Sequence, residues 1–334
     1  NAGVSWTNIV KTTTTQSYLN LTTTRYFRAL VTSTGCVGAY SIVDSVVVNP
    51  ISVGGTITTA ATVCRGANSG TLTLAGNTGT VQYWEFSING GLTYTPIVNT
   101  TTSQAYLNLT ATTIYRANVK SGACAAINSG TVTITVSPVS VGGTTSINDT
   151  VCSGINGATI NLSGQTGSVT NWQSSLNGIT WTPIANTTTS QTYSNIVNTT
   201  YYQANITSGA CPAALSSIDT ITVDVPSVGG TVSASANVCY GTNGDTLFLT
   251  GETGNVIRWE YSVDGGINWL SISNTTTMYI YSNIIITTVY RAVVQNGACS
   301  SVNSATAILT VNPVSVGGTI SGATTVCGGT NSGT

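Results

Sequence analysis

Residues 83–88 read YWEFSI, and their side chains alternate in character with a period of two. Trp84, Phe86 and Ile88 fall on one face of an extended chain, and the polar residues between them fall on the other. The same alternation recurs in TLTLAG at 71–76, IYRANV at 114–119 and TVTITV at 131–136. The pattern predicts antiparallel β-strands with one buried face and one solvated face.

These strands belong to a unit that recurs about every 88 residues. The stretch SVGGT marks the period at 52–56, 140–144, 227–231 and 315–319. Tryptophans keep the same phase at Trp84, Trp172 and Trp259. The predicted organisation is three complete repeats at 52–139, 140–226 and 227–314, with partial repeats at 1–51 and 315–334.

Each complete repeat is large enough to fold alone. The partial repeats 1–51 and 315–334 do not add up to one unit, because strands equivalent to residues 72–88 are missing from both. We therefore expect this sequence to be a window on a longer chain.

The turns support an all-β fold. Asn89-Gly90-Gly91 and Asp264-Gly265-Gly266 supply the positive φ that tight hairpins need. Each repeat has about seven short strands, a Trp early in the third and a Tyr that opens the penultimate one, which together describe an immunoglobulin-like β-sandwich. We predict tandem immunoglobulin-like β-sandwich domains arranged head to tail as a rod or filament.

The repeated Gly-Gly of SVGGT resembles a phosphate-binding loop at first sight. Such a loop opens a helix and carries a Lys, and neither follows here. SVGG instead follows the last strand of a repeat, after Pro50, Pro138, Pro226 or Pro313. We expect the glycines to let the backbone turn closely from one sandwich into the next.

The composition excludes several classes of partner. Only 5% of the 334 residues are charged and the formal net charge is -1, so we expect no nucleic-acid partner. No apolar run approaches the roughly 20 residues of a spanning helix, so we expect no direct membrane insertion.

Eight cysteines keep phase with the repeats, and the chain has no His. The close spacing of zinc ligands is absent, so we expect no metal site. The two cysteines of a repeat lie about 60 residues apart, and closing such a loop stabilises a fold by about 4 kcal/mol in the chain-entropy model. We therefore expect one disulfide within each repeat: Cys64–Cys124, Cys152–Cys211 and Cys239–Cys299.

Two alternatives stay open. Cys36 could pair with Cys64 across a junction, or the cysteines could be free buried thiols. In the favoured scheme the partners of Cys36 and Cys327 lie outside the window. Disulfides of any connectivity would imply an oxidising, extracytoplasmic compartment.

We find no pattern of catalytic or cofactor-binding residues, so we do not expect an enzyme. No His is present for general base catalysis, and no paired carboxylates recur from repeat to repeat. Aromatic residues just after the hairpin, Trp6, Tyr94, Trp181 and Trp269, are candidates for ligand contact, although single aromatics on strands usually cover the edge of a sandwich.

The sequence resembles the immunoglobulin-like tandem repeats of giant cell-surface adhesins of gliding Bacteroidetes. The resemblance rests on TVCxG before a Leu-alternating strand, Trp with a downstream NGG or DGG hairpin, YRA, GAC and a closing TVTITV-like strand. It departs from the pattern at Gln203, where other repeats carry Arg116 and Arg291. The resemblance implies export by the type 9 secretion system, an extracellular, cell-surface location, and a role in adhesion and gliding.

Four of the six aspartates precede Ser or Thr and then an aliphatic residue. This triplet resembles the O-glycosylation sequon of exported Bacteroidetes proteins. The candidate acceptors are Ser45, Thr150, Thr220 and Thr246. Glycans would keep a surface with few charges hydrated and would hinder strand pairing between molecules.

Two functions remain open. The first is a stalk or filament segment of a bacterial surface adhesin, whose partners are neighbouring repeats of the same chain and other filaments, bundled through Thr-rich segments such as 99–104 and 186–191. The second is a set of binding modules, each of which contacts surface polysaccharide or protein through its own aromatic residue.

Overall fold

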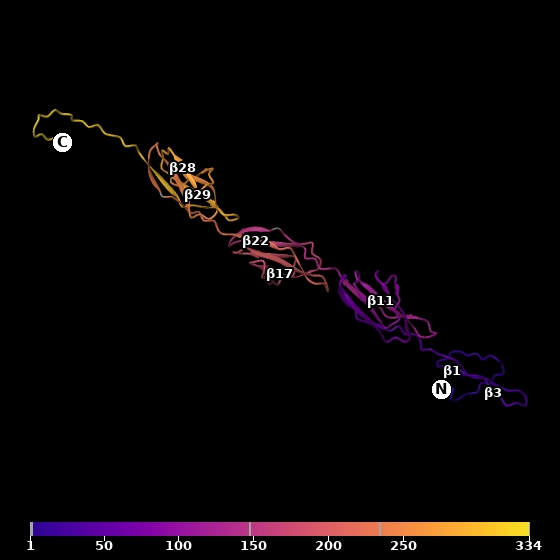
Figure 1. Cartoon of the computed structure of the whole chain (residues 1–334). Coiled ribbons are helices and arrows are strands. Elements are labelled where there is room, and N and C mark those ends of the chain that lie inside the picture. Colours follow the sequence, from indigo (N-terminus) through magenta and orange to yellow (C-terminus); the bar gives the residue numbers. More distant parts are fainter. Residues whose placement is uncertain (1–2, 147, 234, 334) are drawn as a thin grey trace. The chain divides into compact units, whose positions relative to one another are not determined.

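The computed structural model describes residues 3–146, 148–233 and 235–333, and every regular element within them is a β-strand (Figure 1). The chain divides into two compact units. The first unit contains residues 1–144, 164–171 and 204–216, and the second contains 145–163, 172–203 and 217–334. The predicted repeat at 52–139 therefore lies in the first unit, the predicted repeat at 227–314 lies in the second, and the predicted repeat between them is divided.

The strands of residues 1–139 are β1 (Arg25–Phe27), β2 (Leu30–Val31), β3 (Ala39–Tyr40), β4 (Asp44–Val46), β5 (Thr56–Thr58), β6 (Ala61–Cys64), β7 (Ser69–Ala75), β8 (Thr80–Ser87), β9 (Thr95–Ile97), β10 (Ser103–Leu107), β11 (Thr113–Lys120), β12 (Ile127–Asn128) and β13 (Val132–Ser137). The strands of residues 140–226 are β14 (Thr144–Thr145), β15 (Asp149–Cys152), β16 (Gly157–Ser163), β17 (Ser168–Ser175), β18 (Thr182–Ile184), β19 (Ser190–Ser194), β20 (Thr200–Thr207), β21 (Ala214–Leu215) and β22 (Asp219–Asp224). The strands of residues 227–314 are β23 (Thr231–Val232), β24 (Ala236–Cys239), β25 (Gly244–Thr250), β26 (Asn255–Ser262), β27 (Leu270–Ile272), β28 (Met278–Ser282), β29 (Thr288–Gln295), β30 (Val302–Asn303) and β31 (Ala307–Asn312).

The first complete repeat consists of two sheets. One has the strand order β10-β7-β5, and the other has the order β6-β13-β11-β8-β9 with β12 paired to β11. Strand β6 runs parallel to β13, while β11 is antiparallel to both β13 and β8. The placement of β7 and β10 on one sheet and of β8, β11 and β13 on the other is that of an immunoglobulin-like sandwich. The repeats at 140–226 and 227–314 have equivalent strand orders.

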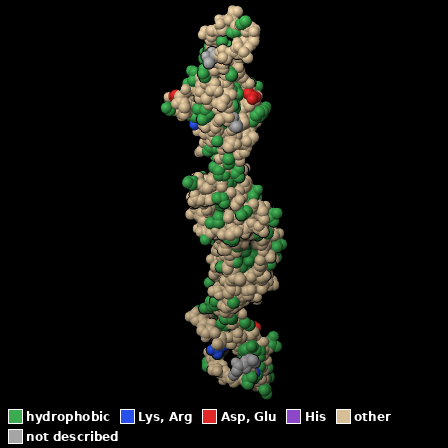
Figure 2. All heavy atoms as spheres, turned by 90° about the vertical axis from the view of Figure 1, so that its left-hand side faces the viewer, with side chains coloured by type: hydrophobic (Ala, Val, Ile, Leu, Met, Phe, Trp, Pro, Cys, Tyr) green, Lys and Arg blue, Asp and Glu red, His purple; other side chains and the backbone are tan. Residues whose placement is uncertain are grey.

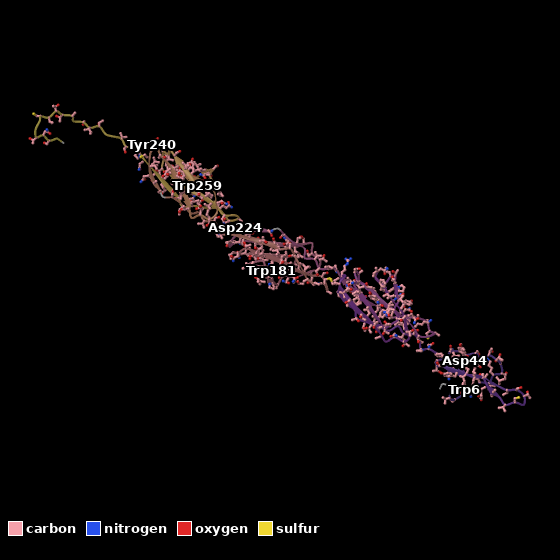
Figure 3. The ribbon with its side chains drawn as sticks, viewed as in Figure 1. Trp6, Asp44, Trp181, Asp224, Tyr240 and Trp259 are labelled. Atoms are coloured by element: carbon pink, nitrogen blue, oxygen red, sulfur yellow. A yellow bond between two sulfur atoms is a disulfide. The ribbon has the colours of Figure 1, made fainter. Side chains whose placement is uncertain are left out.

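The core lies between the two sheets. Trp84 of β8 is fully buried, and it packs with Leu72 and Leu74 of β7 and with Tyr115 of β11. Its indole N–H donates to the carbonyl of Thr101 at 2.9 Å, which satisfies the one polar atom of a large apolar side chain. Trp172 and Trp259 donate to Thr188 and Thr276 in the same way, and Figure 3 labels Trp259 within its repeat.

The alternation in YWEFSI ends one residue earlier than the pattern predicts. Trp84 is buried and Phe86 is half-buried, but Ile88 is 65% exposed and Ser87 is buried. Strand β8 ends at Ser87 because its hydroxyl accepts the amide of Gly91 at 3.0 Å and so begins the hairpin turn. The predicted positive φ is present in this turn, at +74° for Gly90 and +87° for Gly91.

The N-terminal partial repeat retains the end of the same sheet. Strand β1 pairs with β4 in the register Arg25↔Val46, which matches the register Thr113↔Ile134 of β11 and β13. Residues 315–333 form no strand.

Candidate functional site

The SVGG segment is built into the repeat that it begins. Gly54 packs so closely on the backbone of Asn128 that a Cβ atom would collide with it, and Gly55 has a φ of +74°. The preceding Ser52 hydroxyl accepts the amide of Ser121 at 2.9 Å, which ties the segment to the turn after β11. Because the segment leads into the strand β5 and no helix follows, it does not have the structure of a phosphate loop.

The same contacts recur in the other complete repeats. Gly142 and Gly229 pack on the backbones of Leu215 and Asn303, and each is followed by a glycine at a φ of +73° or +69°. The equivalent serine hydroxyls accept amides at 2.9 Å, from Ser208 to Ser140 and from Asn296 to Ser227.

The two cysteines of a repeat lie beside different segments of the chain. Cys64 ends β6 opposite Ser137, which is the last residue of the repeat's final strand. Cys124 lies in the turn after β11, and its Sγ is 3.3 Å from the carbonyl oxygen of Pro50, which precedes the repeat. Cys64 thus lies at the end of the domain where the chain leaves the repeat, and Cys124 lies at the end where the chain enters it.

The disulfides join cysteines of adjacent repeats. Cys64 is bonded to Cys211, and Cys152 is bonded to Cys299, each pair with Cα atoms 4.6 Å apart and 147 residues apart in the sequence. The prediction of one disulfide within each repeat, Cys64–Cys124, Cys152–Cys211 and Cys239–Cys299, is therefore wrong. The alternative pair Cys36–Cys64 is not formed either.

In each disulfide, the cysteine in the turn lies against backbone carbonyl groups at the end of the preceding repeat. Cys211 lies in the turn after β20, and its Sγ is 3.1 Å from the carbonyl oxygen of Pro138. Cys299 follows β29 in the same way, with its Sγ 3.3 Å from the carbonyl oxygen of Val225. Beside Cys299, Asp224 Oδ2 also accepts the amide of Ala298 at 2.8 Å.

Four cysteines have no disulfide partner among the residues that the structure describes. Cys36, Cys239 and Cys327 are exposed and Cys124 is half-buried. Cys36 and Cys327, whose partners we expect outside this sequence, are two of these four, and Cys124 and Cys239 are the others.

A shallow groove of about 590 Å³ lies beside the first disulfide. It is lined by Cys64 and Asn68 on one side and by Ala210 and Pro212 on the other. Cys64 itself is only 9% exposed.

Three of the four candidate ligand-contact aromatics are covered by arginines of the same chain. The Arg116 guanidinium carbon lies 3.6 Å from the ring centre of Tyr94, and that of Arg291 lies 3.8 Å from that of Trp269. Arg28 stacks on Trp6 at 4.1 Å. These rings therefore make cation–π contacts within the fold.

Trp181 differs because its repeat carries Gln203 where the others carry arginine. Gln203 is buried, and within the described residues no cation stacks on the half-buried Trp181 ring. Trp6 and Trp181 are labelled in Figure 3.

Each stacked arginine of the complete repeats also pairs with a glutamate of the neighbouring strand. Arg116 Nε is 2.5 Å from Glu85 Oε2, and Arg291 Nε is 2.7 Å from Glu260 Oε2. Burial raises the pKa of Glu260, but hydrogen bonds from Arg291 and Arg258 outweigh it and leave the pKa below its usual range. Sequence reasoning missed these triads, although the arginine of YRA and the aromatic after the hairpin recur together.

A family comparison accounts for the periodicity. The family model described as "Domain of unknown function (DUF8696)" matches residues 1–50, 53–138, 141–225 and 228–313, which is most of the chain. The chain belongs to this family. Its four matched segments are DUF8696 repeats, and the first coincides with the N-terminal segment that contains β1 to β4.

The solved structures to which the chain is similar include three multidomain segments. The three N-terminal domains of the Highly Immunogenic Outer Capsid protein (Hoc) of bacteriophage RB49 match with a TM-score of 0.39 and 12% identity, over 76% of this chain and 96% of that one. Titin domains A168–A170 match with a TM-score of 0.35 and 15% identity, over 79% and 99%. The FN1–FN3 domains of chicken CNTN1 match with a TM-score of 0.29 and 12% identity, over 77% and 97%. A search of curated proteins finds none that matches the chain.

The four candidate glycan acceptors of the DUF8696 repeats differ in exposure. Ser45 and Thr150 are exposed, while Thr220 and Thr246 are half-buried. In three of the triplets the Asp carboxylate accepts the amide of the acceptor residue, at 2.8 Å for Ser45, 2.8 Å for Thr150 and 2.7 Å for Thr246. Figure 3 labels Asp44, which precedes Ser45.

Thr220 is the exception, because its amide donates to Asn148 Oδ1 at 2.8 Å. The preceding Asp219 is 1% exposed, and among the residues that the structure describes neither of its carboxylate oxygens has a hydrogen-bond partner of good geometry. Burial, followed by the nearby Asp149 carboxylate, raises the pKa of Asp219 to about 6, and the amide of Thr220 lowers it in part.

Asp219 occupies a position that is apolar in the other complete DUF8696 repeats. Strand registers align it with Val132 and Ala307, both of which are buried. Asp149 accepts a hydrogen bond from the Tyr193 hydroxyl at 3.1 Å, and burial together with this bond raises the pKa of Tyr193 to about 12.

The surface carries few charges, as Figure 2 shows for one face, where most side chains are uncharged. Among the described residues, no group of three or more His, Cys, Asp or Glu side chains could hold a metal ion. No helix in the described ranges is long and apolar enough to cross a membrane.

In the Thr-rich segments considered for lateral bundling, many polar groups form hydrogen bonds with other groups of the same segment. Asn99 Oδ1 accepts the amide and the hydroxyl of Thr101, both at 2.9 Å, and the Thr101 hydroxyl donates to the carbonyl of Ser103 at 2.8 Å. Asn186, Thr188 and Ser190 repeat the arrangement. These segments thus hold the loop that caps the buried Trp.

Proposed function

We propose that the chain is a force-bearing stalk segment of a large bacterial cell-surface adhesin, exported by the type 9 secretion system and used in surface attachment and gliding. Tandem immunoglobulin-like repeats with disulfides are typical of extracellular structural and adhesive proteins. The adhesin family, the export route and the link to gliding rest on the resemblance of the repeat motifs. On this proposal the chain is not an enzyme, and its direct partners are neighbouring repeats.

The observation that carries the proposal is the covalent route through the disulfides. Cys64–Cys211 and Cys152–Cys299 overlap, because the segment 152–211 lies inside both loops. Tension applied to the ends would therefore pass through residues 1–64, 152–211 and 299–334 and bypass the rest. The chain could not be drawn out to its full contour length even if every sandwich unfolded.

Single-molecule stretching between the two termini tests this role. At ~3.5 Å per residue, the reduced chain would extend to about 1,170 Å and the oxidised chain, with about 160 residues in its shortest covalent route, to about 560 Å. We expect the oxidised limit to be about half the reduced one. Equal limits would show that the disulfides do not limit extension, and the force-bearing proposal would fall.

One observation favours the second candidate, a ligand-binding module. Trp181 is the ring that lacks a stacked arginine in the described structure, so its face is not occupied by a cation of the fold. Such a ring could contact a sugar. A glycan array that shows binding by the full chain, lost in Trp181→Ala and kept in Trp269→Ala, would support the module.

A further inference from the structure

Two amides replace the ion pair beside the aromatic ring of the middle repeat. The register of β17 with β18 places Gln173 where the register of β8 with β9 places Glu85. The registers of β20 with β22 and of β11 with β13 place Gln203 at the position of Arg116. The Arg–Glu pair that lies against the ring in the first and third repeats is therefore a pair of uncharged side chains here.

A third position on the same face of the sheet also differs. Tyr201 aligns with Ile114 of the first repeat. Ile114 lies near Tyr94, because a Cβ atom built on Gly91 would lie 3.1 Å from the Tyr94 hydroxyl and 3.9 Å from Ile114 Cδ1. The alignment thus places a second half-buried aromatic side chain, that of Tyr201, close to the hairpin and on the face that carries Trp181.

The hairpin of the middle repeat leaves the indole N–H of Trp181 available. In the third repeat the indole N–H of Trp269 donates to the carbonyl of Gly266 at 2.9 Å. The middle hairpin is one residue shorter, because residues 175–181 read SLNGITW whereas residues 262–269 read SVDGGINW. No residue in the described part of the chain accepts the Trp181 N–H.

The other polar groups of this face are also without partners. Within the described ranges, the side-chain amides of Gln173 and Gln203 and the hydroxyl of Tyr201 form no hydrogen bond with another residue. Gln203 is only 5% exposed, and unpaired buried polar groups are uncommon in folded proteins because their desolvation costs free energy. A ligand with hydroxyl groups would supply the partners that the fold does not.

The charge of the middle repeat limits the class of ligand. Residues 140–226 contain no Lys, Arg or Glu, and their charged residues are Asp149, Asp219 and Asp224. The repeat thus has no cation to pair with an acidic ligand. Aromatic rings pack against the C–H groups of a sugar, and amides both donate to and accept from its hydroxyl groups. Together these groups fit an uncharged saccharide.

We propose that Trp181, Tyr201, Gln173 and Gln203 form a binding site for an uncharged saccharide, and that the first and third repeats lack such a site. Trp181 and Tyr201 pack on the sugar, while Gln173 and the indole N–H form hydrogen bonds with its hydroxyl groups. Gln203 fills the place of the arginine without bringing a charge. The site rests on the second candidate function, the ligand-binding module, and adds its place in the fold and the class of its ligand.

An array of defined oligosaccharides, probed with the full chain, tests the ligand class. The neutral probes are oligosaccharides of glucose, mannose, galactose and xylose. The charged probes are oligosaccharides of galacturonate, hyaluronan, chondroitin sulfate and chitosan. We expect the chain to bind one or more neutral probes and none of the charged ones, and we expect Trp181→Ala to lose that binding.

A double variant tests the place of the site. Gln173→Glu combined with Gln203→Arg installs the ion pair of the neighbouring repeats and should weaken binding of the neutral probe about tenfold, because the guanidinium covers the ring. Glu260→Gln combined with Arg291→Gln makes the opposite change in the third repeat and is the matched control, which should leave the affinity unchanged. Circular dichroism checks that both chains fold.

A milder variant keeps the test decisive if the double variant misfolds. Tyr201→Val introduces the residue type of the equivalent Val289, removes the second ring and should also weaken binding about tenfold. Binding that needs Trp181 but withstands these variants, or that prefers a charged probe, would overturn the inference and leave the binding module in place. A chain that binds no probe at all would overturn both.

Discussion

Cys64 and Cys211 are separated by 147 residues, yet their Cα atoms lie 4.6 Å apart and their sulfurs are bonded. The bond joins the exit of one DUF8696 repeat to a turn at the entrance of the next. Cys152–Cys299 repeats the arrangement one unit further along, so the segment 152–211 carries a bond at each of its ends.

Peptide mapping checks this connectivity directly. After thiol alkylation and denaturation, digestion of the unreduced chain with trypsin and an Asp-specific protease should yield residues 44–65, 149–218 and 292–334 as one cross-linked species. Residues 121–148, which contain Cys124, should be released separately. Recovery of 44–65 joined to 121–148 would restore the pairing within repeats.

The sequence predicts the strands and their repetition but not the partners of the cysteines. Burial of Trp84, Leu72 and Tyr115 follows from side-chain alternation, which is a local property. Loop entropy cannot select between a 60-residue and a 147-residue closure, because it grows with the logarithm of length and the two differ by only about 0.8 kcal/mol. The decisive fact, that Cys64 and Cys124 lie at different ends of a repeat, depends on the sheet order.

The same limit applies to the aromatic residues after the hairpin. Their spacing marks them as partly exposed, which is correct for Tyr94 and Trp269. That Arg116 and Arg291 cover these rings depends on the pairing of β8 with β11 and of β26 with β29, which places distant residues side by side. The raised pKa of Asp219 is likewise visible only once β22 is placed in the sheet.

Gly142→Ala tests the close contact of the SVGG segment. The new Cβ would meet the backbone of Leu215, which cannot move aside as a side chain could, so we expect a loss of about 1–3 kcal/mol in the free energy of unfolding. Gly317→Ala is the matched control, because Gly317 holds the same place in the fourth SVGG and has no atom within 4 Å of its Cβ position. Urea denaturation of both variants gives the comparison, and equal midpoints would contradict the contact.

Asp219 makes the stability of the middle repeat depend on pH. Its pKa is raised from 3.8 to about 6 in the folded chain, so folding favours the protonated form. The stabilising effect of that proton is complete below pH 3.8 and is lost as the pH rises through about 6, at a cost of about 3 kcal/mol. Asp149 and Tyr193 interact electrostatically with Asp219, and Tyr202 stands opposite it in the strand register.

Asp219→Ala introduces the residue type found at the equivalent Ala307, and it should remove this dependence. Hydrogen exchange of residues 219–224, measured at pH 4.5 and pH 7 and corrected for intrinsic rates, reports the local stability. We expect protection in the native chain to fall at the higher pH and protection in the variant to stay level. A native chain with level protection would mean that Asp219 is not held protonated.

Arg291→Gln mimics the glutamine of the middle repeat and removes two contacts at once. The variant loses the ion pair with the buried Glu260 and the stacking on Trp269, so we expect a destabilisation of about 2 kcal/mol at neutral pH. Arg258→Gln is the control, since Arg258 is 41% exposed and stacks on no ring of the described structure; its loss should cost less than about 1 kcal/mol.

Acid should reduce the difference between native and Arg291→Gln chains. The pKa of Glu260 is lowered in the fold, so the stability that the ion pair contributes is present above the usual Glu pKa and is lost as the pH falls through the folded value. Urea denaturation of both chains at several pH values, followed by their total tryptophan fluorescence, measures this. A difference that persists unchanged into acid would assign the effect to stacking and not to the ion pair.

Glycan attachment should follow the exposure of the four Asp-Ser/Thr triplets. Ser45 and Thr150 are exposed, so we predict that protein purified from its native cells carries sugar at both. We predict none at Thr220, because this residue lies in β22 between two paired strands and follows the buried Asp219. Thr246, half-buried on β25, remains a candidate.

Intact-mass measurement before and after Ser45→Ala and Thr150→Ala should show the loss of one glycan mass per substitution. Thr220→Ala is the control, which should lose no glycan mass. A native protein whose mass equals that of the bare polypeptide would exclude glycosylation at all four positions.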